Sequence, residues 1–199
     1  MKAAIILKDA YLNIFKNEYD IIVGADRGAL HAIKNGIIPD ISIGDFDSVN
    51  EEEFEIIKNK SKKLIQLNKI KDRSDTHEAI MLVKDYDTIE ILGGIQGRRI
   101  EHLFANIIDL INYPNVLMKD ENSLIETVND TNYIVRDEYK FVSLYAVIDS
   151  IIDLDGFKYN LKDYNLKKND PLCLSNEIIN NPKIKLKEGK LLIIYSHGD

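Results

Sequence analysis

Short apolar runs alternate with helical patterning from the start of the chain to about residue 127. The apolar runs, which we interpret as strands, are Ala3–Leu7, Ile21–Val23, Ile41–Ile43, Leu64–Leu67, Ile89–Leu92 and Val116–Met118. The segments with helical patterning are Ala29–Lys34, Glu51–Lys60, Thr76–Lys84 and Glu101–Ile111. Strands that alternate with helices are typical of a mostly parallel sheet covered on both faces.

Local signals support these helices. Ser48–Glu51 and Asp75–Glu78 each fit a capping box, in which the first side chain accepts a hydrogen bond from the backbone three residues on. In the last helix the apolar residues recur with helical spacing and form one apolar face. These residues are Leu103, Phe104, Ile107, Ile108 and Ile111.

Helical periodicity fades from about residue 130, and short β-like runs replace it. These runs are Tyr133–Val135, Lys140–Ile148, Ser150–Leu154, Leu172–Ser175, Lys183–Lys187 and Leu191–Tyr195. Glu188-Gly189 is typical of a tight hairpin turn between the last two runs. We therefore predict the α/β class, with a mostly parallel, Rossmann-like domain over residues 1–127 and a smaller all-β, sandwich-like domain over residues 128–199. Open strand edges should make the second domain pack on the first or on a partner subunit.

Composition narrows the function. The chain has 199 residues, 45% of them hydrophobic and 30% charged, with a net charge of −7. This acidity argues against nonspecific binding to nucleic acid or to an anionic membrane. The single cysteine, Cys173, excludes an internal disulfide, and its apolar neighbours favour a buried residue over a nucleophile. Without an apolar run long enough to span a bilayer, we expect a cytoplasmic protein.

Aspartates follow three of the predicted strands. Asp26 comes after Ile21–Ala25, and Asp45 and Asp47 come after Ile41–Ile43. Asp72 and Asp75 follow Leu64–Leu67 after a short loop and precede a helix. In an extended backbone the spacing of Asp45 and Asp47 would point both carboxylates to one side. Ligands of open parallel sheets bind beyond the carboxyl ends of the strands. Carboxylates at that position could bind Mg²⁺ together with the phosphate oxygens of a substrate. The alternative is that these acids are solvated residues and helix caps.

A glycine-rich turn, Gly93–Arg99, follows the strand Ile89–Leu92 and opens the helix that carries Glu101 and His102. Such a turn can present backbone N–H groups and guanidinium groups to an anion. Alone it is a weak signal. Beside the carboxylates it indicates a site for a nucleoside triphosphate, with metal on one side of the phosphates and arginine on the other.

Several segments, in order from about residue 20 to the C-terminus, together resemble the motifs of the thiamine pyrophosphokinases. They are Ala25–Ala29, Ile38–Asp40, Gly44–Ser48, Lys71–Asp75, Arg98–His102, Ala105–Asn106, Gly156–Leu161 and Leu174–Glu177. The Gly44–Ser48 match is the most specific. The sequence departs from the family pattern at Glu101, Ser74, His77, Arg27 and Leu30, where aspartate, threonine, an acid, glycine and asparagine are usual. It also has Leu7–Ala10 where a glycine-rich turn is usual.

The resemblance implies transfer of a pyrophosphoryl group from ATP to the hydroxyl of thiamine, with release of AMP. It assigns Asp45, Asp47, Asp72 and Asp75 to Mg²⁺ and phosphate, and one of them to the hydroxyl proton. It assigns Arg99, at the family arginine position, to the triphosphate, and Asp26 and Glu101 to orienting the array. Ser175 and Asn176 fall on the thiamine side. A homodimer is implied, with residues 130–199 in its interface.

Other functions stay open on the sequence alone. The same phosphate chemistry would serve a pyrophosphokinase for another small alcohol, such as a hydroxymethylpterin, although the Ser175-Asn176 segment favours thiamine. A catalytically silent thiamine- or nucleotide-binding module is a second alternative, and the retained aspartates argue against it. His31 and His102 are interpreted as packing or hydrogen-bonding residues rather than as catalysts.

Overall fold

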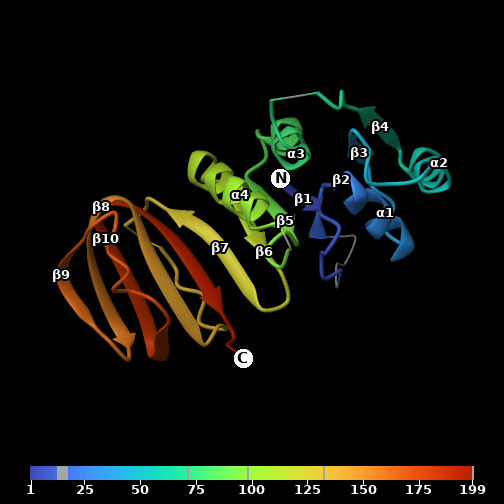
Figure 1. Ribbon diagram of the computed structural model, residues 1–199. Coiled ribbons are helices and arrows are strands. Elements are labelled where there is room, and N and C mark those ends of the chain that lie inside the picture. The colour runs from blue at the N-terminus through green and yellow to red at the C-terminus, as the bar shows by residue number, and fades with distance from the viewer. Residues whose placement is uncertain (13–17, 71, 98, 132, 199) are drawn as a thin grey trace. The chain divides into compact units, whose positions relative to one another are not determined.

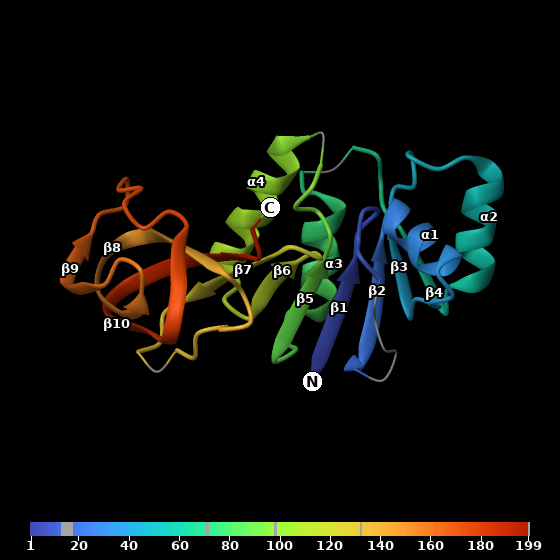
Figure 2. The ribbon, with the colours of Figure 1, turned by 90° about the horizontal axis from the view of Figure 1, so that it is seen from below.

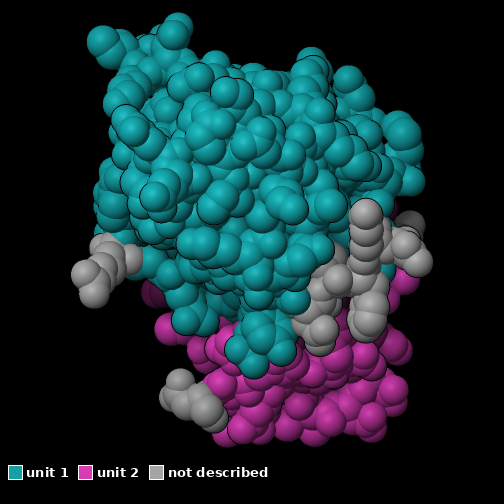
Figure 3. All heavy atoms as spheres, turned by 90° about the vertical axis from the view of Figure 1, so that its right-hand side faces the viewer, with its two compact units in different colours: residues 1–121 teal, residues 122–199 magenta. Residues whose placement is uncertain are grey.

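The computed structural model describes residues 1–12, 18–70, 72–97, 99–131 and 133–198. The chain divides into two compact units, Met1–Glu121 and Asn122–Asp199, coloured separately in Figure 3. The first combines strands and helices, whereas the second is built of strands. The predicted mixed α/β class is confirmed. No helix in the described ranges is long and apolar enough to cross a membrane.

In the described part of unit 1, six parallel strands lie in the order β4-β3-β2-β1-β5-β6 (Figure 1). Their bounds are β1 Lys2–Ile6, β2 Ile21–Ala25, β3 Ile41–Gly44, β4 Lys63–Gln66, β5 Thr88–Leu92 and β6 Val116–Lys119. Each corresponds to one of the apolar runs. Because all six strands run in one direction, they end at a common edge, which we call the carboxyl edge.

The helices among the described residues that connect these strands are α1 Arg27–Lys34, α2 Glu51–Lys60, α3 Asp75–Val83 and α4 Ile100–Asn112. α1 contacts α2, and α3 contacts α4. Since crossovers between parallel strands are right-handed, the strand order places the first pair on one face and the second pair on the other (Figures 1 and 2). Each helix follows a strand and therefore begins at the carboxyl edge.

Close packing holds α1 against the sheet. A Cβ on Gly28 would lie 2.0 Å from the carbonyl oxygen of Ile6, so only glycine fits beside β1. A Cβ on Gly24 would lie 2.5 Å from the Cα of Ala29 in the same way. The start of α1, and with it Asp26, is therefore held tightly against the ends of β1 and β2.

Where unit 2 is described, its antiparallel strands are β7 Ser123–Val128, β8 Phe141–Phe157, β9 Leu161–Leu166 and β10 Asn176–Ser196, in the order β7-β10-β8-β9. β10 pairs twice with the start of β8, because Val142 lies opposite both Asn176 and Tyr195. The sheet therefore curls, and the two ends of β10 flank the same segment.

Several predictions for this region are wrong. Tyr133–Val135 has no regular structure, and Leu172–Ser175 lies in a turn. The runs Lys140–Ile148 and Ser150–Leu154 form one strand, β8. The predicted hairpin at Glu188-Gly189 is instead an irregularity within β10, where the register shifts on both sides of Glu188. Gly189 has a φ of 109°, which a bulge in a strand can require as readily as a turn.

The helix starts and one helix face also differ from expectation. The capping box of α2 is formed by Asn50 and Glu53, not by Ser48 and Glu51. α3 is capped by Ser74, whose hydroxyl accepts from the backbone of His77, so Asp75 is the first helical residue rather than the cap. In α4 the buried residues are Asn106, Asp109 and Leu110, whereas Phe104 and Ile108 of the predicted apolar face are exposed.

Candidate active site at the carboxyl edge

Asp26 lies between β2 and α1 with an unusual backbone, φ 48° and ψ −123°. Its N–H donates to the Ile43 carbonyl at 2.8 Å, and its Oδ2 accepts from the Ser48 hydroxyl at 2.7 Å. The other carboxylate oxygen, Oδ1, is buried and has no hydrogen-bond partner among the described residues. A buried acceptor without a donor is costly, which points to a cation or donor supplied by a ligand.

Asp45 and Asp47 follow β3 in a loop that is not extended. Phe46 between them has a φ of 56°, which overturns the premise that an extended backbone aligns the two carboxylates. The reason is packing, because Phe46 is 5% exposed and is buried with Ala29, Leu30 and Ile57. Its burial fixes the loop: Asp45 is half-buried, and its Oδ1 accepts from the N–H of Asp47 at 3.2 Å.

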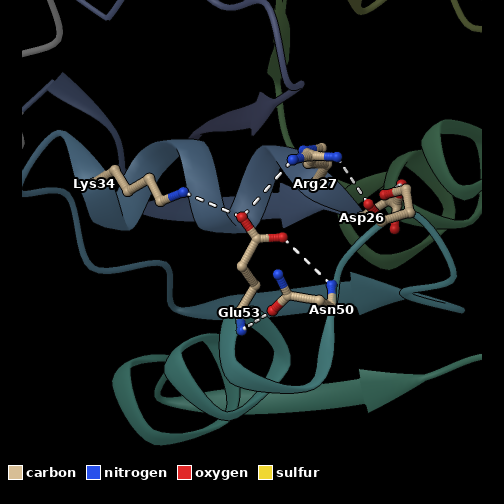
Figure 4. Close-up of polar contacts among 6 residues, drawn as sticks. Asp26, Arg27, Lys34, Asn50 and Glu53 are labelled. Atoms are coloured by element: carbon tan, nitrogen blue, oxygen red, sulfur yellow. Dashed lines mark hydrogen bonds and ion pairs between the residues drawn. The ribbon is translucent and has the colours of Figure 1, made fainter.

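Polar contacts from two helices also hold this loop, as Figure 4 shows. The Arg27 guanidinium donates to the Ser48 carbonyl at 2.8 Å and lies 3.7 Å from the Glu53 carboxylate. Lys34 of α1 reaches the same carboxylate at 3.2 Å. Ser48 was predicted to be a helix cap and a motif residue but not a partner of Asp26, and Glu53 had no predicted role. The sequence signal for these contacts was Arg27, which stands where the family usually has glycine.

Asp75 begins α3, which packs on β1, β2 and β3 and therefore brings its first turn to the carboxyl edge. Asp75 is half-buried and Asp72 is exposed in the preceding loop. Lys71, part of the same motif, lies outside the described residues. His77, where an acid is usual in the family, contacts Asp109 of α4 through Nδ1 at 2.8 Å and so joins the two helices.

Two N–H groups at the start of the glycine-rich turn are bonded within the protein. The N–H of Gly94 donates to Asp9 Oδ1 at 2.9 Å, and the N–H of Gly93 donates to the Lys119 carbonyl at 3.0 Å. Asp9, which has no predicted function, is therefore the acceptor for one N–H of this turn.

Basic and acidic groups remain at the start of α4. Arg99 occupies the N-cap position of α4 without a capping side-chain hydrogen bond, and its exposed Nε donates to Glu101 Oε1 at 2.8 Å. This hydrogen bond lowers the pKa of Glu101. Arg98 lies outside the described residues. His102 is exposed, and His31 hydrogen-bonds the Ala10 carbonyl at 2.8 Å, in keeping with a hydrogen-bonding role.

In unit 2, Ser175 is exposed with a φ of 51°, and its N–H donates to the Ser143 hydroxyl. Asn176 is 3% exposed, and its amide binds both backbone groups of Tyr159, accepting at 3.0 Å and donating at 2.8 Å. Cys173 is buried as expected, and burial raises the pKa of its thiol to about 11, which disfavours a nucleophilic thiolate.

No group of three or more histidine, cysteine, aspartate or glutamate side chains is placed to hold a metal within the described ranges. The donor set nevertheless suits Mg²⁺, which is commonly bound by one or two carboxylates together with substrate phosphates and water. The backbones of Asp26 and of Gly44, which directly precedes Asp45, lie close together, because a Cβ on Gly44 would come 3.0 Å from the Asp26 Cα. Hard oxygen donors are thus available at the carboxyl edge.

Comparisons with known proteins specify the family. The model of the thiamin pyrophosphokinase catalytic domain matches residues 12–122, and that of the thiamin pyrophosphokinase vitamin B1 binding domain matches residues 131–191. A thiamine pyrophosphokinase of Bacillus subtilis (strain 168) is 30% identical over 195 residues, which cover 92% of this chain and 90% of that protein.

Solved structures agree with these matches. Thiamine pyrophosphokinase from Bacillus subtilis superposes with a TM-score of 0.84 at 28% identity, over 98% of this chain and 99% of that one. The enzyme from Geobacillus thermodenitrificans gives 0.82 at 26% identity, over 100% and 98%. A family protein from Enterococcus faecalis, 24% identical over the full length of both chains, shares the fold with a TM-score of 0.87.

The parallel sheet, the acidic carboxyl edge and these matches define the class of the protein as an ATP-dependent diphosphotransferase. Within that class, the chain belongs to the thiamine pyrophosphokinase family. The reaction of this family moves pyrophosphate from ATP to the hydroxyl of thiamine and yields thiamine diphosphate and AMP. Thiamine, rather than a pterin alcohol, is therefore the acceptor, and the silent-module alternative is disfavoured.

Proposed function

We propose that Asp45, Asp47, Asp72 and Asp75 organise Mg²⁺ and the triphosphate of ATP at the carboxyl edge while thiamine attacks. The observation that carries this proposal is the meeting of strand ends and helix starts at one edge, beside a buried Asp26 oxygen without a partner. When bound, Mg²⁺ would neutralise charge on the phosphates. Catalysis of such transfers rests mainly on positioning and charge neutralisation.

In the proposed mechanism the thiamine hydroxyl oxygen forms a bond to the β-phosphorus. The bond between that phosphorus and the oxygen that bridges to the α-phosphate breaks, and AMP departs with the electron pair. One of the aspartates accepts the hydroxyl proton. Arg99 leaves its exposed contact with Glu101 to neutralise charge on the triphosphate as AMP departs. Asp26 and Glu101 orient the array.

The two units divide this work. We assign unit 1, Met1–Glu121, to a Rossmann-like, nucleotide- and metal-binding catalytic domain and unit 2, Asn122–Asp199, to a sandwich-like domain for substrate binding and dimerisation, with the boundary six residues before the predicted one at 127. The two family models support the division, and the curl of β10 around the start of β8 supports a sandwich. In the second domain Ser175 contacts thiamine, and Asn176 holds the neighbouring Tyr159 segment in place.

Removal of the metal tests the catalytic proposal. AMP formation from ATP and thiamine should stop in the presence of EDTA and return when excess Mg²⁺ is added. Zinc added in equal amount is the matched control, because Mg²⁺ chemistry relies on hard oxygen donors whereas Zn²⁺ prefers nitrogen and sulfur. Unchanged turnover in EDTA would refute the role of Mg²⁺ but leave the family assignment intact.

We further propose a cytoplasmic homodimer. ATP, the co-substrate, is an intracellular metabolite, and a symmetric partner could cover exposed strand edges of residues 130–199. Sedimentation should therefore give twice the chain mass at micromolar concentration. A fully active monomer would contradict the dimer and any thiamine pocket shared between subunits.

A further inference from the structure

Arg27 connects three elements around the acidic loop. It is the first residue of α1, and its side chain is 48% exposed. One Nη donates to the Ser48 carbonyl at 2.8 Å, and the other lies 3.7 Å from Glu53 Oε1 of α2. Figure 4 shows the Arg27 side chain pointing toward Glu53. The planar fork of arginine suits such bridging of two acceptors, which the single ammonium of lysine matches poorly.

Glu53 is itself fixed. Its Oε2 accepts from the N–H of Asn50 at 3.3 Å, its own N–H donates to Asn50 Oδ1 at 2.9 Å, and Lys34 contacts Oε1 at 3.2 Å. The hydrogen bond from Asn50, followed by that from Lys34, lowers the pKa of Glu53. Arg27 therefore meets a carboxylate that is ionised at neutral pH and held at the start of a helix.

Ser48 ends the acidic loop and is bound at both of its polar groups. Its hydroxyl donates to Asp26 Oδ2 at 2.7 Å, and its carbonyl accepts from Arg27. At the other end, Phe46 is anchored in the core between α1 and α2. The positions of Asp45 and Asp47 thus depend on one apolar anchor and one polar brace.

We propose that Arg27 and Glu53 are positioning residues that brace the Asp45–Ser48 loop for its cation. The inference rests on the proposed function, in which this loop carries Mg²⁺ ligands. The family pattern has glycine at position 27, so the brace belongs to this chain rather than to the shared machinery. Its loss should weaken cation binding at the loop and spare thiamine binding, because the bridge ends at Ser48 and Glu53.

Arg27→Ala tests the brace, with Lys58→Ala as a matched control. Lys58 is also a cation but pairs with Glu55 on the exposed surface of α2, at 3.3 Å. Arg27→Ala should raise the Mg²⁺ concentration for half-maximal AMP formation about tenfold, equivalent to about 1.4 kcal/mol. The KM for thiamine should change by less than about twofold, as should every constant of Lys58→Ala.

Two conservative variants separate bracing from folding. Glu53→Gln retains a side chain that fits the capping box but removes the charge that Arg27 meets, so its Mg²⁺ requirement should rise while the thermal unfolding midpoint stays near that of the unmodified protein. Arg27→Lys should fall between Arg27→Ala and the unmodified protein. If Arg27→Ala does not fold, these two variants decide the question.

A binding measurement makes the brace testable without turnover. Free Mn²⁺, followed by its paramagnetic resonance signal, is titrated with the protein and ATP but without thiamine. Weaker Mn²⁺ binding by Arg27→Ala than by Lys58→Ala supports the brace. Equal binding by the two variants overturns it, whereas absence of AMP formation by the unmodified protein would instead overturn the proposed function.

Discussion

Asn176→Ala is a sensitive probe of how the thiamine-side segment is held. The buried amide binds both the N–H and the carbonyl of Tyr159, at 3.0 and 2.8 Å. A typical hydrogen bond contributes about 0.5–1.5 kcal/mol net. Loss of the pair should therefore lower the free energy of unfolding of unit 2 by about 1–3 kcal/mol. The same variant should raise the KM for thiamine more than that for ATP.

Ser175→Ala is the matched control, because its exposed side chain neighbours Asn176 and the variant keeps the N–H bonded to Ser143. This control should change stability by less than about 0.5 kcal/mol. Urea unfolding gives the free energy of unfolding of the whole chain. Because a chain of two units need not unfold in a single transition, hydrogen exchange of peptides that span Tyr159 then localises the effect. If Asn176→Ala is as stable as Ser175→Ala and the Tyr159 segment is equally protected, the interpretation of Asn176 as a tie is refuted.

Three further predictions concern the acidic loop, the arginine and a surface ion pair. Asp45→Asn or Asp47→Asn should lower the AMP formation rate by orders of magnitude while circular dichroism shows a native fold; near-normal turnover would rule out the loop as a metal site. Arg99→Ala should reduce turnover far more than Arg98→Ala, whereas equal defects would show that both arginines contact phosphate. The Lys187 ammonium, followed by the Asp163 N–H, lowers the pKa of Asp153 from 3.8 to about 2. The ionised Asp153 carboxylate should thus stabilise the folded state above pH 3.8, and this contribution should be lost as the pH falls toward 2. In carbon NMR titrations Lys187→Met should move the Asp153 midpoint upward; an unmoved midpoint would exclude Lys187 as the cause.

The strands and helices of unit 1 were predictable because central parallel strands are buried on both faces and appear as continuous apolar runs. The buried face of α4 was not predictable from apolar spacing, because Asn106 and Asp109 are buried in place of Phe104 and Ile108. Asp109 reaches His77, 32 positions earlier in the chain. A periodicity argument does not detect a buried polar contact of that range.

The candidate site likewise has features that were predictable from the sequence and features that were not. The positions of Asp26, Asp45 and Asp75 at the carboxyl edge follow from strand order, which the alternation of elements implies. The bend at Phe46 does not, since it arises from packing between two helices. The hydrogen bond from the Gly94 N–H to Asp9 also does not follow from strand order, because the two residues are 85 positions apart in the sequence.

The central claim is tested most directly by incubating the purified chain with ATP, Mg²⁺ and thiamine and measuring both products. AMP and thiamine diphosphate should appear in equal amounts, and neither should form without thiamine. Release of ADP instead of AMP, or AMP formation with a hydroxymethylpterin but not with thiamine, would contradict it.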